Sequence, residues 1–338
     1  MSRLVSAVLA VGLCMAPPGA GAVAGPQIVK VGSLAPEGTP WHLMIQDIGE
    51  EWARISNGRV ALRIYPGGVL GDEPDMLKKM RIGQIQALGV TTVGLSRIDP
   101  SIQCLQLPMQ FDTYEELDFV RDRMEAKLEA IYERKGAVML GFIDAGWVHF
   151  FTRKPVSTID EIRKLKLFVW AGDLKSLQLW TLARFTPVPL PVTDMMMGLQ
   201  TGLIDVLDAP PLVVMANQWF GIANHMMDLR WAPLLGGLAI DRRAWERFPA
   251  AQRPAMRDAA RKAGLKLRAQ IRKMNDDAIV AMKERGLTVV PVDAASRAVW
   301  KQEVDKLYPE FRRNLADPAL IDEAMRNRQE YRTKKKGR

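Results

Sequence analysis

The side chains that most often carry nucleophilic or metal chemistry are scarce in this sequence. It holds three histidines and two cysteines: His42, His149, His225, Cys14 and Cys104. The histidines lie far apart along the chain, and no Cys/His pair has the spacing of a zinc site. The sequence also lacks a G-x-S-x-G turn, a P-loop and an H-E-x-x-H helix. We therefore expect no catalytic residues, no metal and no cofactor. A catalytic site assembled from distant residues leaves an exported enzyme as an alternative.

One glycine-rich segment resembles a phosphate-binding loop. Gly67 and Gly68 are followed closely by Gly71. Pro66 precedes the segment, however, and no Lys-Ser/Thr pair follows it. Glycine and proline together more often mark a turn, so we interpret the segment as a turn after a strand.

The N-terminus predicts export. Arg3 is followed by an apolar run over 4–16 and by small residues over 19–24, which is the pattern of a secretory signal peptide at 1–24. Leu13 stands before Cys14, where a lipidated cysteine normally follows a small residue, so cleavage after Ala24 is favoured over a lipid anchor. No later segment offers the ~20 consecutive apolar residues of a membrane helix. We expect the mature chain in the periplasm, with the lone thiol of Cys104 and no disulfide.

The composition is that of an ordinary globular protein, with 48% hydrophobic and 25% charged residues. The formal net charge is +9, but much of the excess lies at the two ends of the chain, at Arg3, Arg332, Lys334, Lys335, Lys336 and Arg338. This distribution does not support a basic face for nucleic acid. It predicts a flexible, solvated basic tail at 331–338.

The mature chain of about 310 residues exceeds what one core usually holds, so two lobes are expected. Apolar periodicity and turn signals predict alternating strands and helices. The predicted strands are 28–32, 60–65, 87–90, 137–142, 167–170, 188–190 and 204–206. The predicted helices are 40–56, 73–82, 114–133, 173–185, 193–201 and 251–285. This alternation is typical of an α/β fold with mostly parallel sheets between layers of helices. The last helix would be about 50 Å long and is expected to span both lobes.

Several local sequences follow one another in a characteristic order along the chain. They are Ser33-Leu34-Ala35-Pro36, Tyr65 to Asp72, Leu107 to Phe111, Pro187 to Pro191, Leu199 to Asp205 and Asn224-His225. In this shared order they resemble the DctP-type solute-binding family of tripartite ATP-independent periplasmic (TRAP) transporters, and the resemblance covers about 28–326.

The resemblance implies a two-lobed, periplasmic-binding-protein-like fold of the type II-like class, which closes on a ligand like a hinged clamp. We assign 28–146 plus 236–270 to lobe I and 147–235 plus 271–330 to lobe II. The implied partners are a small organic ligand and the small and large TRAP membrane permease subunits, with uptake driven by an ion gradient. A monomer that binds no nucleic acid is expected.

Two positions depart from the pattern of the family. The family typically grips a carboxylate with an arginine, and Phe168 stands at the corresponding position. An asparagine is common where this chain has Ala209. Phenylalanine cannot make the paired charge-assisted hydrogen bonds of a guanidinium group. Because both polar anchors become apolar, we expect a ligand that is larger or more apolar than a simple dicarboxylate, such as an apolar or aromatic acid.

The candidate binding residues are mostly aromatic or apolar, and packing in the core is the alternative for each of them. They are Trp41, Thr92, Trp147, His149, Phe168, Trp170, Met195, Asp208, Ala209 and Trp219. His149 and Arg153 could hold an anionic end, although a neutral His149 bonded to a nearby carbonyl is an equal possibility. The alternatives left open are a binding component of an ATP-driven importer, a receptor for a sensor kinase, and a periplasmic carrier of a lipid or hydrophobic compound.

Overall fold

The computed structural model describes residues 25–337, and the predicted signal peptide at 1–24, with Cys14, lies outside them. The strands are β1 Gln27–Ser33, β2 Val60–Tyr65, β3 Ala87–Thr91, β4 Ala137–Trp147, β5 His149–Thr152, β6 Lys166–Trp170, β7 Thr186–Leu190, β8 Val206–Ala209, β9 His225–Met227, β10 Pro233–Asp241 and β11 Thr288–Val290. The helices are α1 Pro40–Ile55, α2 Glu73–Arg81, α3 Thr92–Ile98, α4 Tyr114–Arg134, α5 Ile159–Arg163, α6 Leu174–Leu182, α7 Met195–Thr201, α8 Pro211–Ala216, α9 Arg242–Glu246, α10 Arg253–Lys283, α11 Ala294–Asn314 and α12 Pro318–Lys336. Short 3₁₀ helices are η1 Pro100–Leu105, η2 Val192–Asp194 and η3 Trp219–Gly221.

The first lobe is built on a five-stranded sheet with the order β2-β1-β3-β10-β4. Strand β1 pairs in parallel with β2 and β3, whereas β10 runs antiparallel to β3 and β4. Helix α1 begins where Thr39 precedes Pro40 at the first helical position, as the sequence predicts. Its apolar face, which includes Ile45, Ile48 and Trp52, is buried in the core of this lobe.

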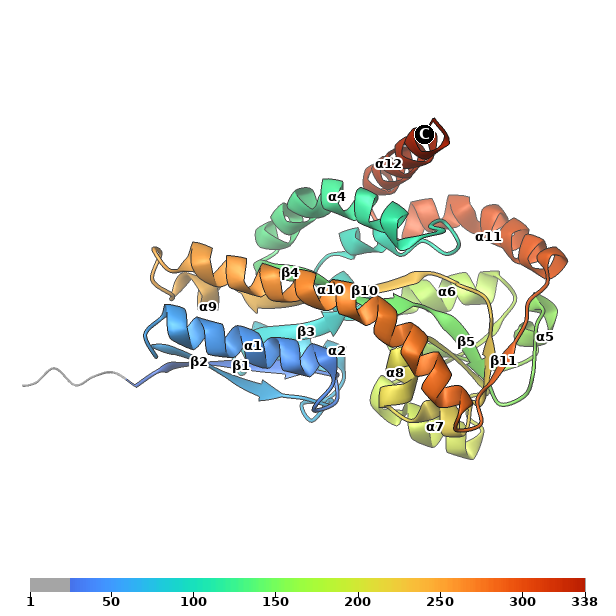
Figure 1. Ribbon diagram of the computed structural model, residues 1–338, viewed down its shortest axis with the longest axis horizontal. Helices are drawn as coiled ribbons and strands as arrows, with labels where there is room; N and C mark the ends of the chain where they lie inside the picture. Colours follow the sequence, from blue (N-terminus) through green and yellow to red (C-terminus); the bar gives the residue numbers. More distant parts are fainter. Residues whose placement is uncertain (1–24, 338) are drawn as a thin grey trace, which may run out of the picture.

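The second lobe is built on a six-stranded sheet with the order β11-β9-β5-β8-β6-β7. Strand β6 is parallel to β7 and β8, and β5 is antiparallel to β8 and β9. The predicted strand at 204–206 is observed later in the chain, as β8. The two mixed sheets and their flanking helices confirm the predicted two-lobed α/β fold (Figure 1).

Two chain segments cross between the sheets and are bonded to each other. One joins β4 to β5 through Val148, and the other joins β9 to β10 through Trp231 and Ala232. The amide of Val148 donates to the carbonyl of Ala232 at 2.8 Å, and the amide of Trp231 donates to the carbonyl of Val148 at 2.9 Å. Helix α10 is the third connection, and Figure 1 shows it running from the first lobe to the second. The predicted long helix at 251–285 is therefore confirmed, with 31 residues.

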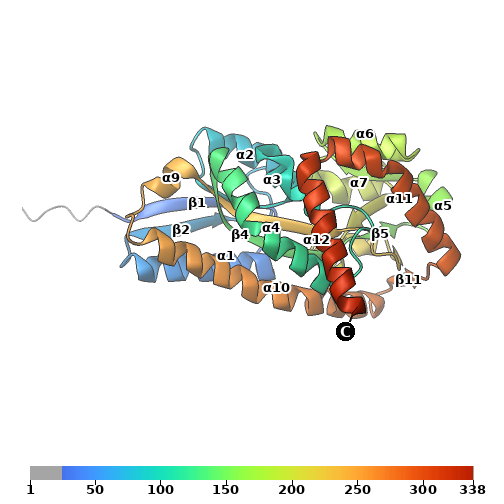
Figure 2. The ribbon, with the colours of Figure 1, turned by 90° about the horizontal axis from the view of Figure 1, so that it is seen from above.

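The C-terminal segment differs from the expected flexible tail. Helix α12 continues through Lys336 and packs beside α4 (Figure 2). The guanidinium group of Arg332 binds the buried carboxylate of Glu116 and, at 2.8 Å, the carboxylate of Asp112. The sequence does not reveal these contacts, because the acidic partners on and before α4 lie far away along the chain. Among the helices of the described chain, none is long and apolar enough to cross a membrane.

Candidate functional site

A cavity of about 660 Å³ lies between the two lobes. Its walls include Ser33 and Thr91 from the first lobe and Phe168, Met195 and Asp208 from the second. A volume of this size is typical of pockets that hold a small organic molecule. Because both sheets contribute to the walls, a ligand in the cavity would contact both lobes at once.

Most of the candidate residues named from the sequence line this cavity. They are Trp41, Thr92, Phe168, Trp170, Met195, Asp208, Ala209 and Trp219. The hydroxyl group of Thr92 is already engaged, because it donates to the carbonyl of Leu235 at 2.8 Å. Their roles in binding stay a prediction.

Trp147 and His149 lie outside the cavity walls. Trp147 is buried with its ring 5.4 Å from that of Tyr114. Nδ1 of His149 lies 3.1 Å from the carbonyl oxygen of Met227. Burial lowers the pKa of His149, so that the ring is neutral and Nδ1–H donates to that carbonyl. The structure therefore places His149 as a satisfied core residue rather than beside a ligand. Arg153, the other suggested anion partner, also lies outside the walls.

Asp72, immediately before α2, forms hydrogen bonds between the two lobes. One carboxylate oxygen accepts from the amide of Glu73 at 2.7 Å and caps the helix. The other accepts from Nε1 of Trp170 at 2.8 Å and from the amide of Val192 at 3.0 Å, both in the second lobe. We call these two bonds the Asp72 latch. They exist because the lobes are together in this conformation.

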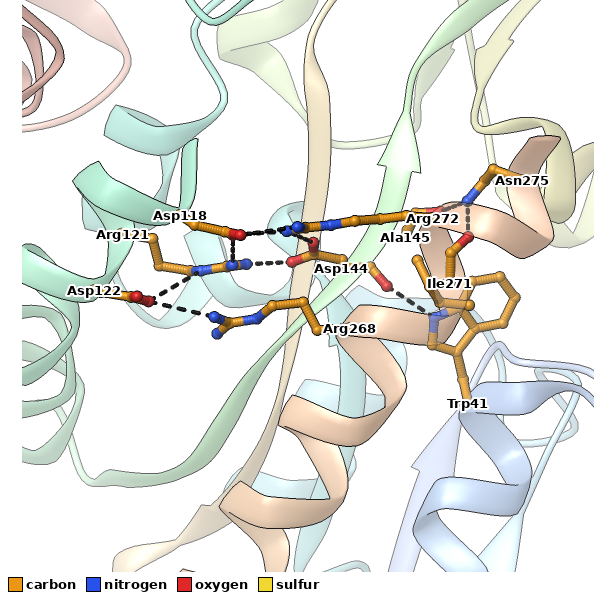
Figure 3. Close-up of polar contacts among 10 residues, drawn as sticks. All are labelled: Trp41, Asp118, Arg121, Asp122, Asp144, Ala145, Arg268, Ile271, Arg272 and Asn275. Carbon is orange, nitrogen blue, oxygen red and sulfur yellow. Dashed lines mark hydrogen bonds and ion pairs between the residues drawn. The ribbon is translucent and has the colours of Figure 1, made fainter. Parts of the chain in front are cut away.

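The C-terminal end of β4 is fixed by Asn275 of α10 (Figure 3). The amide group of Asn275 donates to the carbonyl of Ala145 at 3.0 Å and accepts from the amide of Leu212 at 3.1 Å. It thereby joins β4, α10 and α8, and α8 begins two residues after Ala209 of the cavity wall. Gly146 lies so close that an added Cβ would be 2.5 Å from Nδ2 of Asn275, and its φ is +125°. Only glycine fits this contact.

A buried network of charges lies behind the same strand (Figure 3). Arg121 of α4 is fully buried and binds both Asp118 and Asp144. Arg272 of α10 binds Asp144 at 3.0 Å and Asp118 at 2.6 and 2.8 Å. The backbone carbonyl of Asp144 accepts from the indole of Trp41 at 3.1 Å. The network therefore ties α4, β4 and α10 to a residue of the cavity wall.

An aromatic cluster that the sequence did not reveal contributes to the cavity wall. It consists of Phe150, Trp180, Phe185, Trp231 and Trp300, and all but Phe150 line the cavity. The rings of Trp180 and Trp231 stack with centroids 5.2 Å apart, and those of Phe150 and Trp300 stack at 5.3 Å. Trp180 and Trp300 come from α6 and α11, which are distant in sequence. Only the presence of nine tryptophans hinted at such a cluster.

The electrostatics of the cavity are dominated by carboxylates. Within the described chain, Arg163 is the only basic residue among those that line it. Its guanidinium group is occupied by Glu303 at 2.6 Å, Asp160 at 3.0 Å and the carbonyl of Ala183 at 3.0 Å. Burial without a nearby cation raises the pKa of Asp208 to about 7. The cavity therefore offers no free cation for a carboxylate ligand among residues 25–337.

Glu73 is a second buried carboxylate of the cavity wall. It accepts hydrogen bonds from the amide of Thr91 at 2.7 Å, the hydroxyl of Thr91 at 3.0 Å and the amide of Gly94 at 2.6 Å. Burial raises the pKa of Glu73 to about 7 against these hydrogen bonds. Because three donors already satisfy this carboxylate, its role is to fix the start of α3. No group of three or more potential metal ligands was found in the described part of the chain.

Comparison with known proteins gives the same picture of the fold. The DctP family, described as bacterial extracellular solute-binding protein, family 7, matches residues 31–314. The C4-dicarboxylate-binding periplasmic protein DctP of Rhodobacter capsulatus is 23% identical over 296 residues, covering 86% of this chain and 88% of that protein. The 2,3-diketo-L-gulonate-binding periplasmic protein of Escherichia coli is 22% identical, covering 74% of this chain and 76% of that protein.

Solved structures with the same fold contain small organic acids. The sugar acid binding protein of Advenella mimigardefordensis in complex with galactonate is 17% identical with a TM-score of 0.84, covering 90% of this chain and 99% of that one. A TRAP periplasmic solute binding protein of Desulfovibrio salexigens with bound orotic acid is 17% identical with a TM-score of 0.82 and the same coverage. With a two-lobed fold, an interlobe cavity and a family match over most of its length, this chain belongs to the DctP family of bacterial extracellular solute-binding proteins.

Proposed function

We propose that this protein is the periplasmic receptor of a TRAP transporter, exported by its signal peptide and acting as a monomer without catalysis. It captures a small organic ligand by closure of the two lobes and delivers it to the small and large membrane permease subunits. The observation that carries this proposal is the 660 Å³ cavity whose walls come from both lobes. The names of the relatives and of the solved structures support the transport role.

Closure has a physical basis in contacts that form only when the lobes meet. The Asp72 latch joins the first lobe to Trp170 and Val192, and the guanidinium group of Arg97 binds the carbonyl of Gly172. A ligand that touches both walls adds its own contacts to the closed state. Since a ligand shifts a conformational equilibrium only by its difference in affinity for the two states, such bridging contacts favour closure.

The chemistry of the walls supports a ligand with a large apolar or aromatic part. Phe168 is almost fully buried, with its ring 6.2 Å from that of Trp170, and Ala209 lies in the same wall. Among residues 25–337, the only cation that lines the cavity is Arg163, which already has three partners. Burying apolar surface contributes about 25 cal/mol of binding free energy per Å². Burial of an aromatic group in the cavity would therefore compensate for the missing ion pair with a ligand carboxylate.

This proposal predicts that an aromatic probe binds more tightly than simple acids. We expect isothermal titration calorimetry to give a lower Kd for 3-phenylpropan-1-ol than for succinate or galacturonate. Phe168→Arg should weaken binding of the aromatic probe about tenfold to a hundredfold, because the loss of one buried aromatic contact costs about 1.5–3 kcal/mol. The same variant should bind galacturonate more tightly than the wild type does.

Phe168→Leu is the matched control, since it keeps an apolar side chain at this position. It should retain most of the affinity for the aromatic probe and gain none for galacturonate. Tight binding of succinate or galacturonate by the wild type, without binding of the aromatic probe, would refute the apolar cavity. Turnover of a bound compound would refute the receptor role itself.

A further inference from the structure

Asp208 lies next to the aromatic cluster. In the antiparallel pairing of β5 with β8, Asp208 stands directly opposite Phe150. Directly opposed residues of antiparallel strands share one face of the sheet, with Cβ atoms about 5 Å apart. The ring of Phe150 packs against Trp300 at 5.3 Å and Trp231 at 5.5 Å. The carboxylate of Asp208 thus lies in the cavity wall beside the aromatic cluster.

The carboxylate of Asp208 differs from the other acids of the cavity. The four others that line it are Glu73, Asp144, Asp173 and Glu303. Glu73 and Asp144 are paired as described above. Asp173 accepts from the amide of Ser176 at 3.0 Å and from its hydroxyl at 2.7 Å, and Glu303 binds Arg163 at 2.6 Å. Within residues 25–337, no other side chain pairs with Asp208. Burial disfavours the charged form of its carboxylate, and only a hydrogen bond from its own backbone favours that form.

This arrangement disfavours an anionic group at the same place. A ligand carboxylate near Asp208 would meet a second negative charge without a cation between them, and like charges in a poorly solvated site repel strongly. A group that carries N–H bonds and positive charge would meet an acceptor instead. Aromatic faces attract the same group, because the π electrons give each ring a negative face.

We propose that the ligand is an organic amine with an apolar or aromatic body, whose ammonium group binds the carboxylate of Asp208 beside the aromatic cluster. This inference rests on the proposed receptor function and specifies its ligand class. An apolar or aromatic acid is the ligand expected from the sequence, and the present inference assigns an ammonium group in place of its carboxylate. The ammonium group makes a charge-assisted hydrogen bond to Asp208, while the body of the ligand fills the space lined by Trp180, Trp231 and Trp300.

The experiment compares three probes with the same phenyl ring and three-carbon chain: 3-phenylpropylamine, 3-phenylpropan-1-ol and 3-phenylpropanoate. Isothermal titration calorimetry on the mature protein at pH 7.5 gives the Kd of each. We expect the amine to bind about tenfold more tightly than the alcohol and more tightly still than the carboxylate. Asp208→Asn should weaken binding of the amine about tenfold and change that of the alcohol less than about threefold.

Asp205→Asn is the matched control. Asp205 is three residues away, lies outside the cavity walls, and accepts from the backbone amide of Lys166 at 3.2 Å. This variant removes the same charge and should keep the preference for the amine. Ligand-free Asp208→Asn should unfold at a temperature no lower than the wild type, because it removes a charge held in a poorly solvated wall. A loss of amine binding then reports on the carboxylate rather than on misfolding.

The outcomes separate this inference from the proposed function. If the alcohol binds but the amine binds no more tightly than the carboxylate, the amine assignment is wrong and the apolar receptor stands. If Asp208→Asn weakens binding of amine and alcohol equally, Asp208 is not the partner of the ammonium group and the inference fails. If no phenyl probe binds while galacturonate does, the amine assignment and the apolar cavity both fail, and the receptor role stands.

Discussion

Replacement of Asp144 by leucine is expected to lower the free energy of unfolding by about 3–5 kcal/mol. Asp144 is 1% exposed and binds Arg121, which is fully buried, as well as Arg272. The variant leaves the guanidinium group of Arg121 in the core with Asp118 as its remaining close partner. A buried charge that loses its partner is more costly than an absent pair. Urea unfolding, followed by tryptophan fluorescence, measures the change.

Two controls show whether the effect comes from the buried pair. The double variant Arg121→Met with Asp144→Leu removes both charges and should recover most of the lost stability. Glu51→Ala breaks the exposed pair of Glu51 with Arg54 and should change stability by less than about 1 kcal/mol. A loss of less than about 1 kcal/mol in Asp144→Leu alone would contradict the role given to the network.

Asp72→Ala is expected to weaken ligand binding by about a hundredfold or more. Its carboxylate accepts two hydrogen bonds from the second lobe, at 2.8 Å from Trp170 and at 3.0 Å from Val192. Hydrogen bonds to a charged group each contribute about 1.5–3 kcal/mol. Because both exist only with the lobes together, their loss shifts the equilibrium toward the open form. Calorimetry measures the affinity with the tightest-binding probe, and small-angle scattering measures the shape.

Asp72 also caps α2, so a second variant must separate the two roles. Asp72→Ser keeps a good helix cap but is too short to reach across the cavity. It should lose affinity as Asp72→Ala does, with a smaller loss of stability. Asp75→Ala removes an exposed acid of the same helix, paired with Lys78 at 3.0 Å, and should bind normally. Unchanged affinity in both Asp72 variants would mean that the latch contributes nothing to closure.

Local signals in the sequence were sufficient for most elements of the fold. Thr39 with Pro40 marks the start of α1. The long helix α10 was predicted because no proline follows Pro254 and Gly264 is the one glycine before Gly286. These signals act within a few residues, which is why one sequence reveals them. The strand predicted at 204–206 was displaced because the order of apolar residues does not show where pairing with β5 begins.

The candidate site was predicted in part because the resemblance supplied contacts that composition cannot. Phe168 and Ala209 line the cavity at positions chosen from the family pattern. Trp147 and His149 are adjacent to the crossing segment, and the direction of each side chain there depends on packing against Tyr114 and Met227. Such long-range contacts leave no mark on the local sequence.

The aromatic cluster and the helical C-terminus illustrate the same limit. Trp180 and Trp300 both pack against Phe150 only because α6 and α11 cover one side of the second sheet. Arg332 is ordered by Glu116, which lies far away in sequence. A basic tail is solvated unless acidic partners are placed beside it, and only the fold places them.

The most direct test is native mass spectrometry of the mature protein, purified without denaturation from cells that export it. The account predicts a bound small molecule with an aromatic or apolar body, released when the protein unfolds. A bound C4-dicarboxylate or sugar acid would contradict it, because residues 25–337 place no free cation in the cavity wall to hold one.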